Sequence, residues 1–560
     1  MKHSTRLDAL LACAALAWGC GGGGPAPAGG GTLQPIPHAP ARFVNWENAP
    51  VHPVALTPDG STLLVCNTAD GRLEIFDASG AAPVIAGSVF VGLEPVSVRP
   101  RGADAWVVNH VSDSVSVVDV AGRRVRATLA TRDEPCDVVF AGAPERAYVS
   151  CSQADVVLVF DPEDLAAPPL EIPVDAEDPR ALAASADGSE VYVAIFESGN
   201  GSTLLGGGGD EGSAAGAGAF PPNVVSDPEG PHGGVNPPPN DGASFSPAQN
   251  PLNPAPPPVG LIVKKDGAGA WRDDTGVDWT EFVSGAKAPR SGRPAGWDLP
   301  DRDVAVIDTA TQSVARYLTG LMNVCMDVAV RPSDGSVTVV GTDAVNEVRY
   351  EPNVRGRFLR VLVASVAPGG GSQRHDLNAH LDYSASTLPQ PSRDLSLGDP
   401  RAVAWNSAGT RAFVTGMGSD NLVALDAFFR RIGRVELGSG PTGIAFDGAR
   451  DRLYVLNRFS ASVSVVDATA LQELSRTPFF DPTPEAIREG RPHLYDTHET
   501  SGLGQAACAS CHVDARMDRL AWDLGDPAGA MGAMDQNCVT GILVPCEEFH
   551  PMKGPMTTQT

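Results

Sequence analysis

The sequence predicts an all-β fold, a seven-bladed β-propeller, from two observations. A pattern of about 42 residues recurs along the chain, from "PVALTPDGSTLLVCNTADGRLEIFD" at 53–77 to "PTGIAFDGARDRLYVLNRFSASVSVVD" at 441–467. Within each copy, alternating aliphatic and aromatic residues indicate short strands, and Asp-Gly or a similar pair marks a hairpin. A unit of this length with about four strands is what one blade requires, because a blade buries its faces only against its neighbours.

Five copies share one internal spacing. The residues Leu64, Trp106, Tyr148, Phe413 and Tyr454 each precede an Asp by 13 residues. A sixth copy at 179–196 and a weaker one at 324–350 complete a count of seven. The aspartates that end the five copies are Asp77, Asp119, Asp161, Asp426 and Asp467.

Two insertions are expected inside the propeller, which we assign to residues 42–485. The fourth copy should close near position 205, but the matching "DVAVID" ends at Asp308, so residues 198–300 are inserted. The first half of this insertion is rich in Gly and Pro, a composition that does not bury a core, and the second half indicates a hairpin. A second, polar insertion is expected at 353–398. Each insertion is either a lid over one face of the propeller or a tolerated loop.

The first 41 residues indicate export. Lys2 and Arg6 precede a short apolar run that ends at Gly19 and Cys20, as in a signal peptide. "AWGC" resembles the lipidation box of bacterial lipoproteins, in which case Cys20 carries the lipid; the alternative is an ordinary signal peptide. Residues 21–41 suit a Gly/Pro linker. We expect an exported protein, periplasmic or anchored to the outer membrane by lipid alone, because no later segment is apolar enough to span a bilayer.

Composition excludes some partners. The chain has 560 residues, with 41 Lys and Arg against 67 Asp and Glu, so its formal charge is −26. Such a charge repels phosphate backbones and argues against a nucleic-acid partner. The ten cysteines are too sparse and uneven for a disulfide-framework domain.

The stretch "CASCH" carries the clearest chemistry. Cys508 and Cys511 are three residues apart and His512 follows directly, so one helical turn brings both sulfurs beside the imidazole. This is the pattern for covalent haem c, with two thioether bonds and His512 as an axial iron ligand. Two alternatives remain open: a zinc site that also uses Cys538 and Cys546, and disulfide bonds.

Two resemblances follow from these motifs. "YVLNRFSASVSVVD" and "VVNHVSDSVSVVD" resemble YVTN-type repeats of bacterial seven-bladed propellers. This resemblance implies the fold over about residues 45–470 but only a broad range of functions: binding platforms, lyases and subunits of haem enzymes.

The tail from "CASCHVDARMDRLAWDLGDP" onward is similar to the haem region of propeller fusions related to di-haem cytochrome c peroxidases. It implies a small, mainly α-helical c-type cytochrome region at 486–560. Those relatives continue to a second haem motif, whereas this sequence has one, so the region is expected to be incomplete and peroxidase activity stays open.

The sixth iron ligand decides between electron transfer and peroxidase-type catalysis. Met556 is the favoured candidate and Met552 the next, because both follow His512 at a distance that allows the chain to wrap around a porphyrin. Met517 is too close to His512. The remaining candidates are His550, Met531 and Met534.

Other polar residues carry weaker signals. Cys136 and Cys151 are symmetric about a hairpin and could form a disulfide across two strands. Four residues that begin innermost strands could ring the propeller channel as a ligand site, or could merely join neighbouring blades. His52 and His110 have no partner in the sequence pattern. The four strand-start residues are Asp137, Arg180, Asp327 and Arg401.

Two functions therefore compete. The first is an exported haem c protein that passes electrons to or from a redox partner protein or a small molecule, with the propeller as docking platform; its enzymatic variant is a haem oxidoreductase of the cytochrome c peroxidase type. The second is a propeller-based ligand-binding protein or lyase with a vestigial tail.

Overall fold

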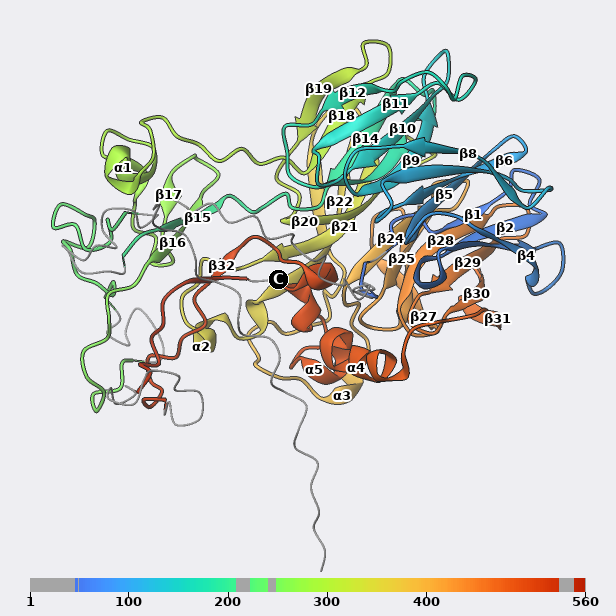
Figure 1. The fold of residues 1–560 in the computed structure, drawn as a ribbon. Coiled ribbons are helices and arrows are strands. Elements are labelled where there is room, and N and C mark those ends of the chain that lie inside the picture. Colours follow the sequence, from blue (N-terminus) through green and yellow to red (C-terminus); the bar gives the residue numbers. More distant parts are fainter. Residues whose placement is uncertain (1–45, 49, 208–221, 240–247, 533–547, 559–560) are drawn as a thin grey trace, which may run out of the picture. The chain divides into compact units, whose positions relative to one another are not determined.

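Four-stranded antiparallel sheets make up most of the secondary structure (Figure 1). The computed structural model describes residues 46–48, 50–207, 222–239, 248–532 and 548–558. Within these residues there are seven sheets of four strands, and six of them use strands that are consecutive in the chain. The chain is predominantly β, and the sheets are consistent with the predicted propeller.

The first three sheets follow the first three sequence repeats. The Asp predicted to close the repeat is the last residue of β3 and of β7, and its carboxylate accepts a backbone N–H from the turn that follows: Ser79 N at 2.9 Å from Asp77 and Gly122 N at 2.8 Å from Asp119. The strands are β1 (Val54–Leu56), β2 (Thr62–Asn67), β3 (Arg72–Asp77), β4 (Val84–Phe90), β5 (Pro95–Arg101), β6 (Asp104–Asn109), β7 (Ser114–Asp119), β8 (Arg124–Ala130), β9 (Pro135–Ala141), β10 (Arg146–Cys151), β11 (Val156–Phe160) and β12 (Leu170–Pro173).

The fourth sheet is interrupted, as the sequence predicts. Its order is β13 (Pro179–Ala184), β14 (Glu190–Ile195), β18 (Val304–Asp308) and β19 (Ser313–Leu318). Glu190 lies opposite Asp308, so the chain leaves this sheet after β14 and rejoins it more than a hundred residues later. The prediction that Asp308 closes the fourth repeat is confirmed.

The residues between β14 and β18 have a core of their own, which the Gly/Pro-rich composition did not predict. The expected hairpin is present as β16 (Leu261–Lys265) and β17 (Trp271–Arg272), and β15 (Ser202–Leu205) joins it as a third strand. The other elements here are α1 (Thr280–Val283) and η3 (Ala288–Ser291). The core is formed by Leu205, Val224, Val225, Leu261, Val263, Trp271, Trp279, Phe282 and Val283.

The fifth sheet differs from the sequence expectation. It consists of β20 (Val324–Val330), β21 (Val337–Ala344), β22 (Leu359–Val366) and β23 (Ser372–Asp376). Its two outer strands thus lie within residues 353–398, which the sequence suggested as an insertion. The short helices α2 (Glu351–Val354) and η4 (Arg355–Arg357) separate β21 from β22 and displace the third strand from its usual spacing.

The last two sheets again match their repeats, since β26 ends at Asp426 and β30 at Asp467. Between the fifth and sixth sheets lies α3 (Gln390–Arg393). The strands are β24 (Pro400–Trp405), β25 (Arg411–Gly416), β26 (Asn421–Asp426), β27 (Arg431–Glu436), β28 (Pro441–Asp447), β29 (Arg452–Asn457), β30 (Ser462–Asp467) and β31 (Gln472–Pro478).

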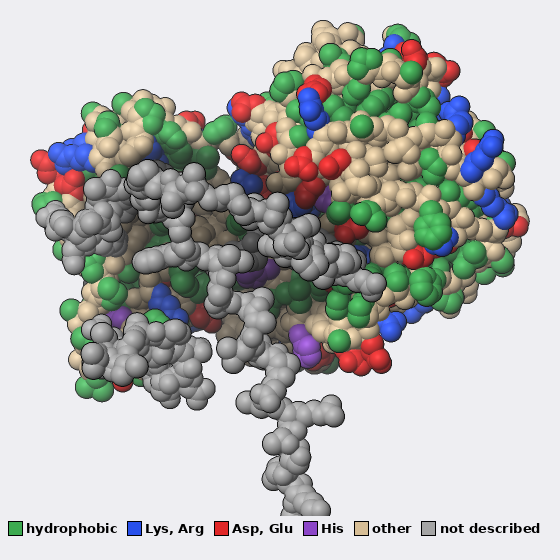
Figure 2. Space-filling view, in the orientation of Figure 1, with side chains coloured by type: hydrophobic (Ala, Val, Ile, Leu, Met, Phe, Trp, Pro, Cys, Tyr) green, Lys and Arg blue, Asp and Glu red, His purple; other side chains and the backbone are tan. Residues whose placement is uncertain are grey.

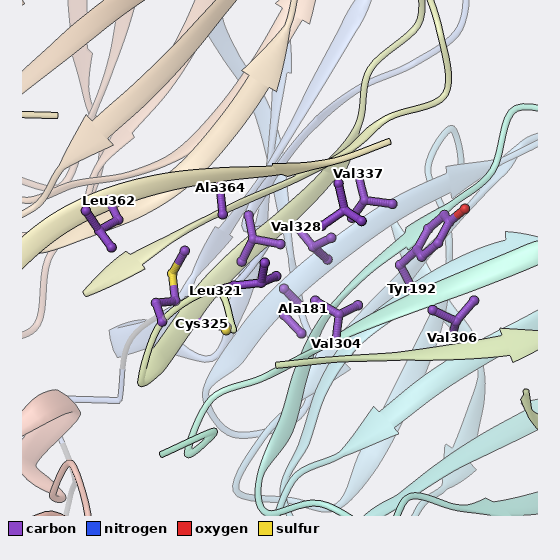
Figure 3. Packing of buried hydrophobic residues seen from close by; sticks show 14 of the residues in the cluster. Ala181, Tyr192, Val304, Val306, Leu321, Cys325, Val328, Val337, Leu362 and Ala364 are labelled. Carbon is purple, nitrogen blue, oxygen red and sulfur yellow. The ribbon is translucent and has the colours of Figure 1, made fainter. Parts of the chain in front are cut away.

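The first strands of the seven sheets contact one another in chain order, and β28 of the last sheet contacts β1 of the first. We call these seven strands the inner ring: β1, β5, β9, β13, β20, β24 and β28. Each of the main hydrophobic clusters lies between two neighbouring sheets, including one between the seventh and the first. Figure 3 shows the cluster between the fourth and fifth sheets, where Val304 and Val306 face Leu321 and Val328. Each sheet therefore depends on both neighbours for burial of its faces.

The disulfide considered between Cys136 and Cys151 is absent, and both thiols are free. The predicted symmetry holds for β9 and β10 up to the pair Ser150–Asp137, where the register shifts by one residue and places Cys151 opposite Pro135. Because a one-residue shift moves a side chain to the other face of the sheet, Cys136 packs toward the fifth sheet and Cys151 toward the second.

The C-terminal segment packs on the sheets, and Trp46–Thr560 form one compact unit. We call the described residues from Glu485 to Thr558 the tail. Its helices, α4 (Glu485–Tyr495) and α5 (Thr497–Thr500), lie at its start. Beyond Thr500 the described residues hold no further α-helix: they form short 3-10 turns, η5 (Cys508–Ser510) and η6 (Val513–Ala515), the ladder of β32 (Ala521–Trp522) with β33 (Met556–Thr557), and a single bridge between Gly532 and Phe549. The expected helical region is thus helical only in its first part. None of the described helices has the length and apolar composition to cross a membrane.

Candidate functional site

The "CASCH" stretch forms a single tight turn. The carbonyl oxygen of Cys508 accepts hydrogen bonds from the backbone N–H groups of Cys511 at 3.3 Å and His512 at 3.1 Å. Cys508 and His512 are exposed, and Cys511 is half-buried. Both thiols are free, and the His512 side chain is exposed. Two free thiols and an accessible imidazole on one turn fit the donor set that haem c requires.

The half-buried thiol lies in a mixed environment. Cys511 packs beside a cluster that contains Leu520 and Trp522, and the Trp522 indole donates a hydrogen bond to Asp518 at 3.0 Å. Burial, followed by the nearby Asp518 carboxylate, raises the pKa of the Cys511 thiol well above its usual value. The thiol is therefore neutral at physiological pH.

Val513, the residue directly after the turn, is fully buried. Its side chain packs against Phe196, which directly follows β14 of the fourth sheet, and against Val324 and Met326 on β20 of the fifth. Burial of a valine contributes about 1.5 kcal/mol or more to the free energy of unfolding. The turn is therefore fixed to the sheets on its C-terminal side.

Asp514 connects the tail to the inner ring through two buried ion pairs. Arg180 on β13 donates from Nη1 to Asp514 Oδ2 at 2.9 Å, and Arg401 on β24 places its Nη1 2.7 Å from Asp514 Oδ1. All three side chains are buried. Asp514 also adopts a left-handed backbone conformation with φ 54°, which residues other than Gly, Asn and Asp rarely adopt. One carboxylate thus bridges the fourth and sixth sheets.

The two arginines are held by the same local motif. "DPRA" occurs at 178–181 and again at 399–402, and in each copy the Asp binds the Arg two residues later through both carboxylate oxygens. The distances are 2.9 and 2.9 Å for Asp178 with Arg180, and 2.8 and 3.0 Å for Asp399 with Arg401. Each guanidinium is thereby fixed in orientation before it meets Asp514.

The charges in this cluster stabilise one another. Burial alone would raise the pKa of Asp514, but Arg401, Arg180 and the nearby Arg458 outweigh it and lower the pKa below its usual value. Burial likewise disfavours the charged arginines, yet the paired carboxylates raise the pKa of both Arg180 and Arg401. Asp514 is therefore ionised over the whole range in which the protein is expected to work.

Further ion pairs join the tail to residues beside the third and fourth sheets. Arg516 pairs with Glu134, which immediately precedes β9. Arg519 pairs with Glu177 at 2.9 Å and also with Glu197. These pairs extend the contact of the tail to the third and fourth sheets.

A second polar cluster spans the inner ring. His52 places Nδ1 2.5 Å from Asp137 on β9 and Nε2 2.9 Å from Asp327 on β20. Burial lowers the pKa of His52, but the charges of Asp137 and Asp327 outweigh it and raise that pKa to about 9. His52 therefore does have partners, contrary to the expectation from sequence. His110 also contacts a carboxylate, with its Nε2 3.6 Å from Glu134.

The four residues predicted to ring the channel serve two purposes. Asp137 and Asp327 also accept hydrogen bonds from backbone N–H groups of the next sheet, from Leu182 at 2.8 Å and from Val403 at 2.7 Å. These two residues therefore join neighbouring sheets, which was one of the two roles considered from the sequence. Arg180 and Arg401 instead bind the tail. All four are thus engaged by residues of this chain.

The candidate sixth ligands are placed differently from one another. Met556 lies on β33 opposite Trp522, and its side chain is 51% exposed. Met552 is 1% exposed and packs against Tyr350. His550 places Nε2 3.3 Å from the carbonyl oxygen of Pro254. Cys20, Cys538, Cys546 and Met534 lie outside the described residues.

Sequence reasoning missed Asp514 and both aspartates of the "DPRA" motifs. The available signal was the exact repetition of "DPRA" at two strand starts, which marks two arginines in equivalent positions. Nothing in the pattern links them to Asp514, because that contact joins residues more than a hundred positions apart. Within the described residues, no group of three or more His, Cys, Asp or Glu side chains is arranged to hold a metal ion.

Comparison with known proteins bears on the fold. No family model and no curated protein matches this sequence. Among solved structures, the chain is similar to hydrazine synthase of Kuenenia stuttgartiensis, with a TM-score of 0.50 and 18% identity over 76% of this chain and 98% of that one. A match to the dihydro-haem d1 dehydrogenase NirN in complex with DHE has a TM-score of 0.39 and 11% identity, over 78% of this chain and 68% of the other. The first likeness supports a shared fold and carries no information on function.

Replacement of Asp514 by Asn tests the link between tail and sheets. Without the carboxylate charge, Arg180 and Arg401 each keep one carboxylate partner but lose the shared one, so we expect the free energy of unfolding to fall by about 2–3 kcal/mol. Residues 505–520 should also become sensitive to limited proteolysis. The matched control is Glu177→Gln, which removes the exposed pair with Arg519 and should cost less than about 1 kcal/mol. Equal effects of the two variants in urea unfolding would contradict the assignment.

The His52 cluster predicts a pH dependence of stability. Because the folded-state pKa of about 9 lies above the unfolded value of 6.5, the stabilisation is complete below pH 6.5 and is lost as pH rises through 9. The loss amounts to at most about 3 kcal/mol. Urea unfolding measured at pH 6.5 and at pH 9.5 should show this decrease in the natural chain and a smaller one in His52→Gln. An identical decrease in both proteins would show that another group is responsible.

Proposed function

We propose that the chain is an exported haem c protein that transfers electrons, and that its seven sheets are the blades of one propeller that serves as the platform for the haem turn. The observation that carries this proposal is the anchorage of the turn: Val513 and Asp514 fix it to three sheets, while Cys508 and His512 remain exposed. A turn held rigidly at an accessible surface is what exchange of electrons with a partner requires.

The roles of the residues follow from their chemistry. Cys508 and Cys511 would hold haem c through thioether bonds, and His512 would bind its iron from one side. When bound, haem c supplies one-electron oxidation and reduction. The chain contributes orientation: the backbone bonds to the Cys508 carbonyl fix the turn, and the buried ion pairs of Asp514 prevent it from moving away from the sheets.

Electron transfer is favoured over peroxidase-type catalysis by the placement of Met556. Its half-exposed side chain lies on β33, which pairs with β32, and Trp522 of β32 belongs to the hydrophobic cluster beside which Cys511 packs. Met552 would first have to leave its buried contact with Tyr350. We therefore keep Met556 as the proposed sixth ligand, and a haem oxidoreductase of cytochrome c peroxidase type is the alternative if that position is open.

The competing function, a ligand-binding propeller or lyase that acts at its centre, has less support. Arg180 and Arg401 are already bound to Asp514, and Asp137 and Asp327 to His52. Among the described residues, each of the four charged side chains of the inner ring predicted as a ligand site is thus already paired with another group of the chain. The tail is accordingly an integral part of the structure, not a vestige.

Location and partners are part of the proposal. The N-terminal residues favour export, with lipidation at Cys20 and a periplasmic or outer-membrane-anchored protein. The partner is a redox protein or a small electron donor or acceptor. On the face drawn in Figure 2, acidic and basic side chains are interspersed, and with a net charge of −26 this disfavours nucleic acid.

Covalent haem attachment is directly testable. The chain produced in a host with haem-maturation machinery should show a Soret band, and haem should remain on the protein after acid–acetone extraction and denaturing electrophoresis. In the double variant Cys508→Ala and Cys511→Ala the haem stain of the band should disappear. Double replacement of the buried thiols Cys66 and Cys325 by Ala is the control and should leave the stain. A stain that persists without Cys508 and Cys511 would refute the assignment.

The sixth ligand has a spectroscopic test. A methionine bound to ferric haem gives a weak band near about 695 nm. We expect this band to vanish in Met556→Leu and to persist in Met552→Leu. A band unchanged by Met556→Leu would exclude this ligand, and its absence from the natural protein would favour an open iron and peroxidase-type chemistry.

A further inference from the structure

A groove of about 700 Å³ lies at the outer strands of the fifth and sixth sheets. Residues of β23 and β27, the fourth strands of these sheets, line it together with the loops beside them. None of the residues that line the groove belongs to the tail, so this groove is distinct from the turn that holds Cys508, Cys511 and His512. Its volume is in the range of small-molecule sites.

Four arginines line the groove, in a chain whose formal charge is −26. Three of them have carboxylate partners: Arg374 with Asp343 at 3.3 Å, Arg430 with Asp426 at 2.7 Å, and Arg434 with Glu436 at 2.8 Å. The fourth, Arg431, has no carboxylate partner within the part of the chain that the structure describes.

Arg431 is bound only to neutral groups among the described residues. Its Nη1 and Nη2 donate to the backbone carbonyl oxygens of Leu377 at 3.2 Å and Leu395 at 2.8 Å. Burial and the charge of Arg434 lower its pKa to about 10, so it stays positive at neutral pH. A half-buried cation without a counter-charge is costly, and an anion in the groove would supply that charge.

The rest of the lining includes an apolar wall, formed by Phe429 and Leu395, beside the polar side chains of His375, His380 and Asp376. The Asp376 carboxylate lies 4.0 Å from Nε of Arg360. Phe429 is buried and packs edge-to-face on Trp405 with ring centres 5.7 Å apart, and the His375 ring stacks on it at 5.2 Å. Leu395, also in the lining, has an exposed side chain. The wall is thus rigid at Phe429 and accessible at Leu395.

We propose that this groove binds a small amphipathic organic anion, whose acid group pairs with Arg431 and whose apolar body lies on Phe429 and Leu395. The charge of Arg431 favours a ligand with an acid group, and the apolar side chains of Phe429 and Leu395 favour one with a hydrocarbon body. An inorganic anion makes only the ion pair with Arg431, and a neutral analogue makes only the apolar contact with Phe429 and Leu395.

Calorimetric titration of the full-length protein tests this with three probes: 4-phenylbutyrate, its neutral amide and inorganic phosphate. We expect saturable binding of 4-phenylbutyrate, with the amide and phosphate each weaker by about tenfold or more. Binding of the amide or of phosphate as tight as that of the acid would overturn the proposal, as would no saturation by 4-phenylbutyrate up to about 10 mM.

Two variants locate the site. Arg431→Gln removes the unpaired charge, and Leu395→Glu adds a carboxylate beside it; each should weaken 4-phenylbutyrate binding by about tenfold. Arg476→Gln, on the outer strand of the seventh sheet, is the control and should bind as the natural chain does. If Arg431→Gln fails to fold, the exposed position Leu395 decides. Unchanged affinity in the folded variants would place the binding elsewhere and refute the proposal.

Discussion

The bridge from Asp514 to Arg180 and Arg401 is the interaction on which the relation between sheets and tail depends. It joins the fourth sheet, the sixth sheet and the residues next to the Cys508–His512 turn through a single carboxylate. Because all three groups are buried, removal of one leaves charge without compensation in a region that water does not reach. The position of the turn is therefore set by the ring, and the tail in turn ties two distant sheets together.

This arrangement explains how so short a motif is held in place by so large a body. A 3-10 turn of a few residues has no core of its own and cannot hold a fixed geometry in isolation. Here the sheets supply the missing rigidity through Val513 and Asp514, and the exposed residues of the turn stay available to a partner. His52 fulfils a comparable role across the ring, since it joins the third and fifth sheets through Asp137 and Asp327.

The sequence predicted those features that arise from local pattern. The strand that ends in Asp77 or Asp119, and the return of the fourth sheet at Asp308, follow from spacing, because each closing Asp caps the turn after its own strand. That Cys508, Cys511 and His512 share one tight turn also follows from their spacing, whereas their role in haem binding stays a prediction. Cys508, Cys511 and His512 lie within five positions of one another.

Features that depend on register or on distant contacts were not predictable in this way. One shifted pair after Ser150 separates Cys136 from Cys151. Two short helices, α2 and η4, lie between β21 and β22, so the outer half of the fifth sheet does not follow the spacing of the sequence repeat. The core of the long insertion gathers residues as far apart as Leu205 and Val283, which no periodic pattern connects. The role of Asp514 was not predictable for the same reason, because only the fold brings it close to Arg180 and Arg401, which are distant in the sequence.

The most direct test of the central claim is a double-mutant cycle in urea unfolding with Asp514→Asn and Arg401→Gln. If the two side chains interact as described, the combined variant should be less destabilised than the sum of the single variants, with a coupling energy of about 1.5 kcal/mol or more. Additive effects, within about 0.5 kcal/mol, would show that Asp514 does not bind the arginine in solution and would contradict this account of how the turn is held.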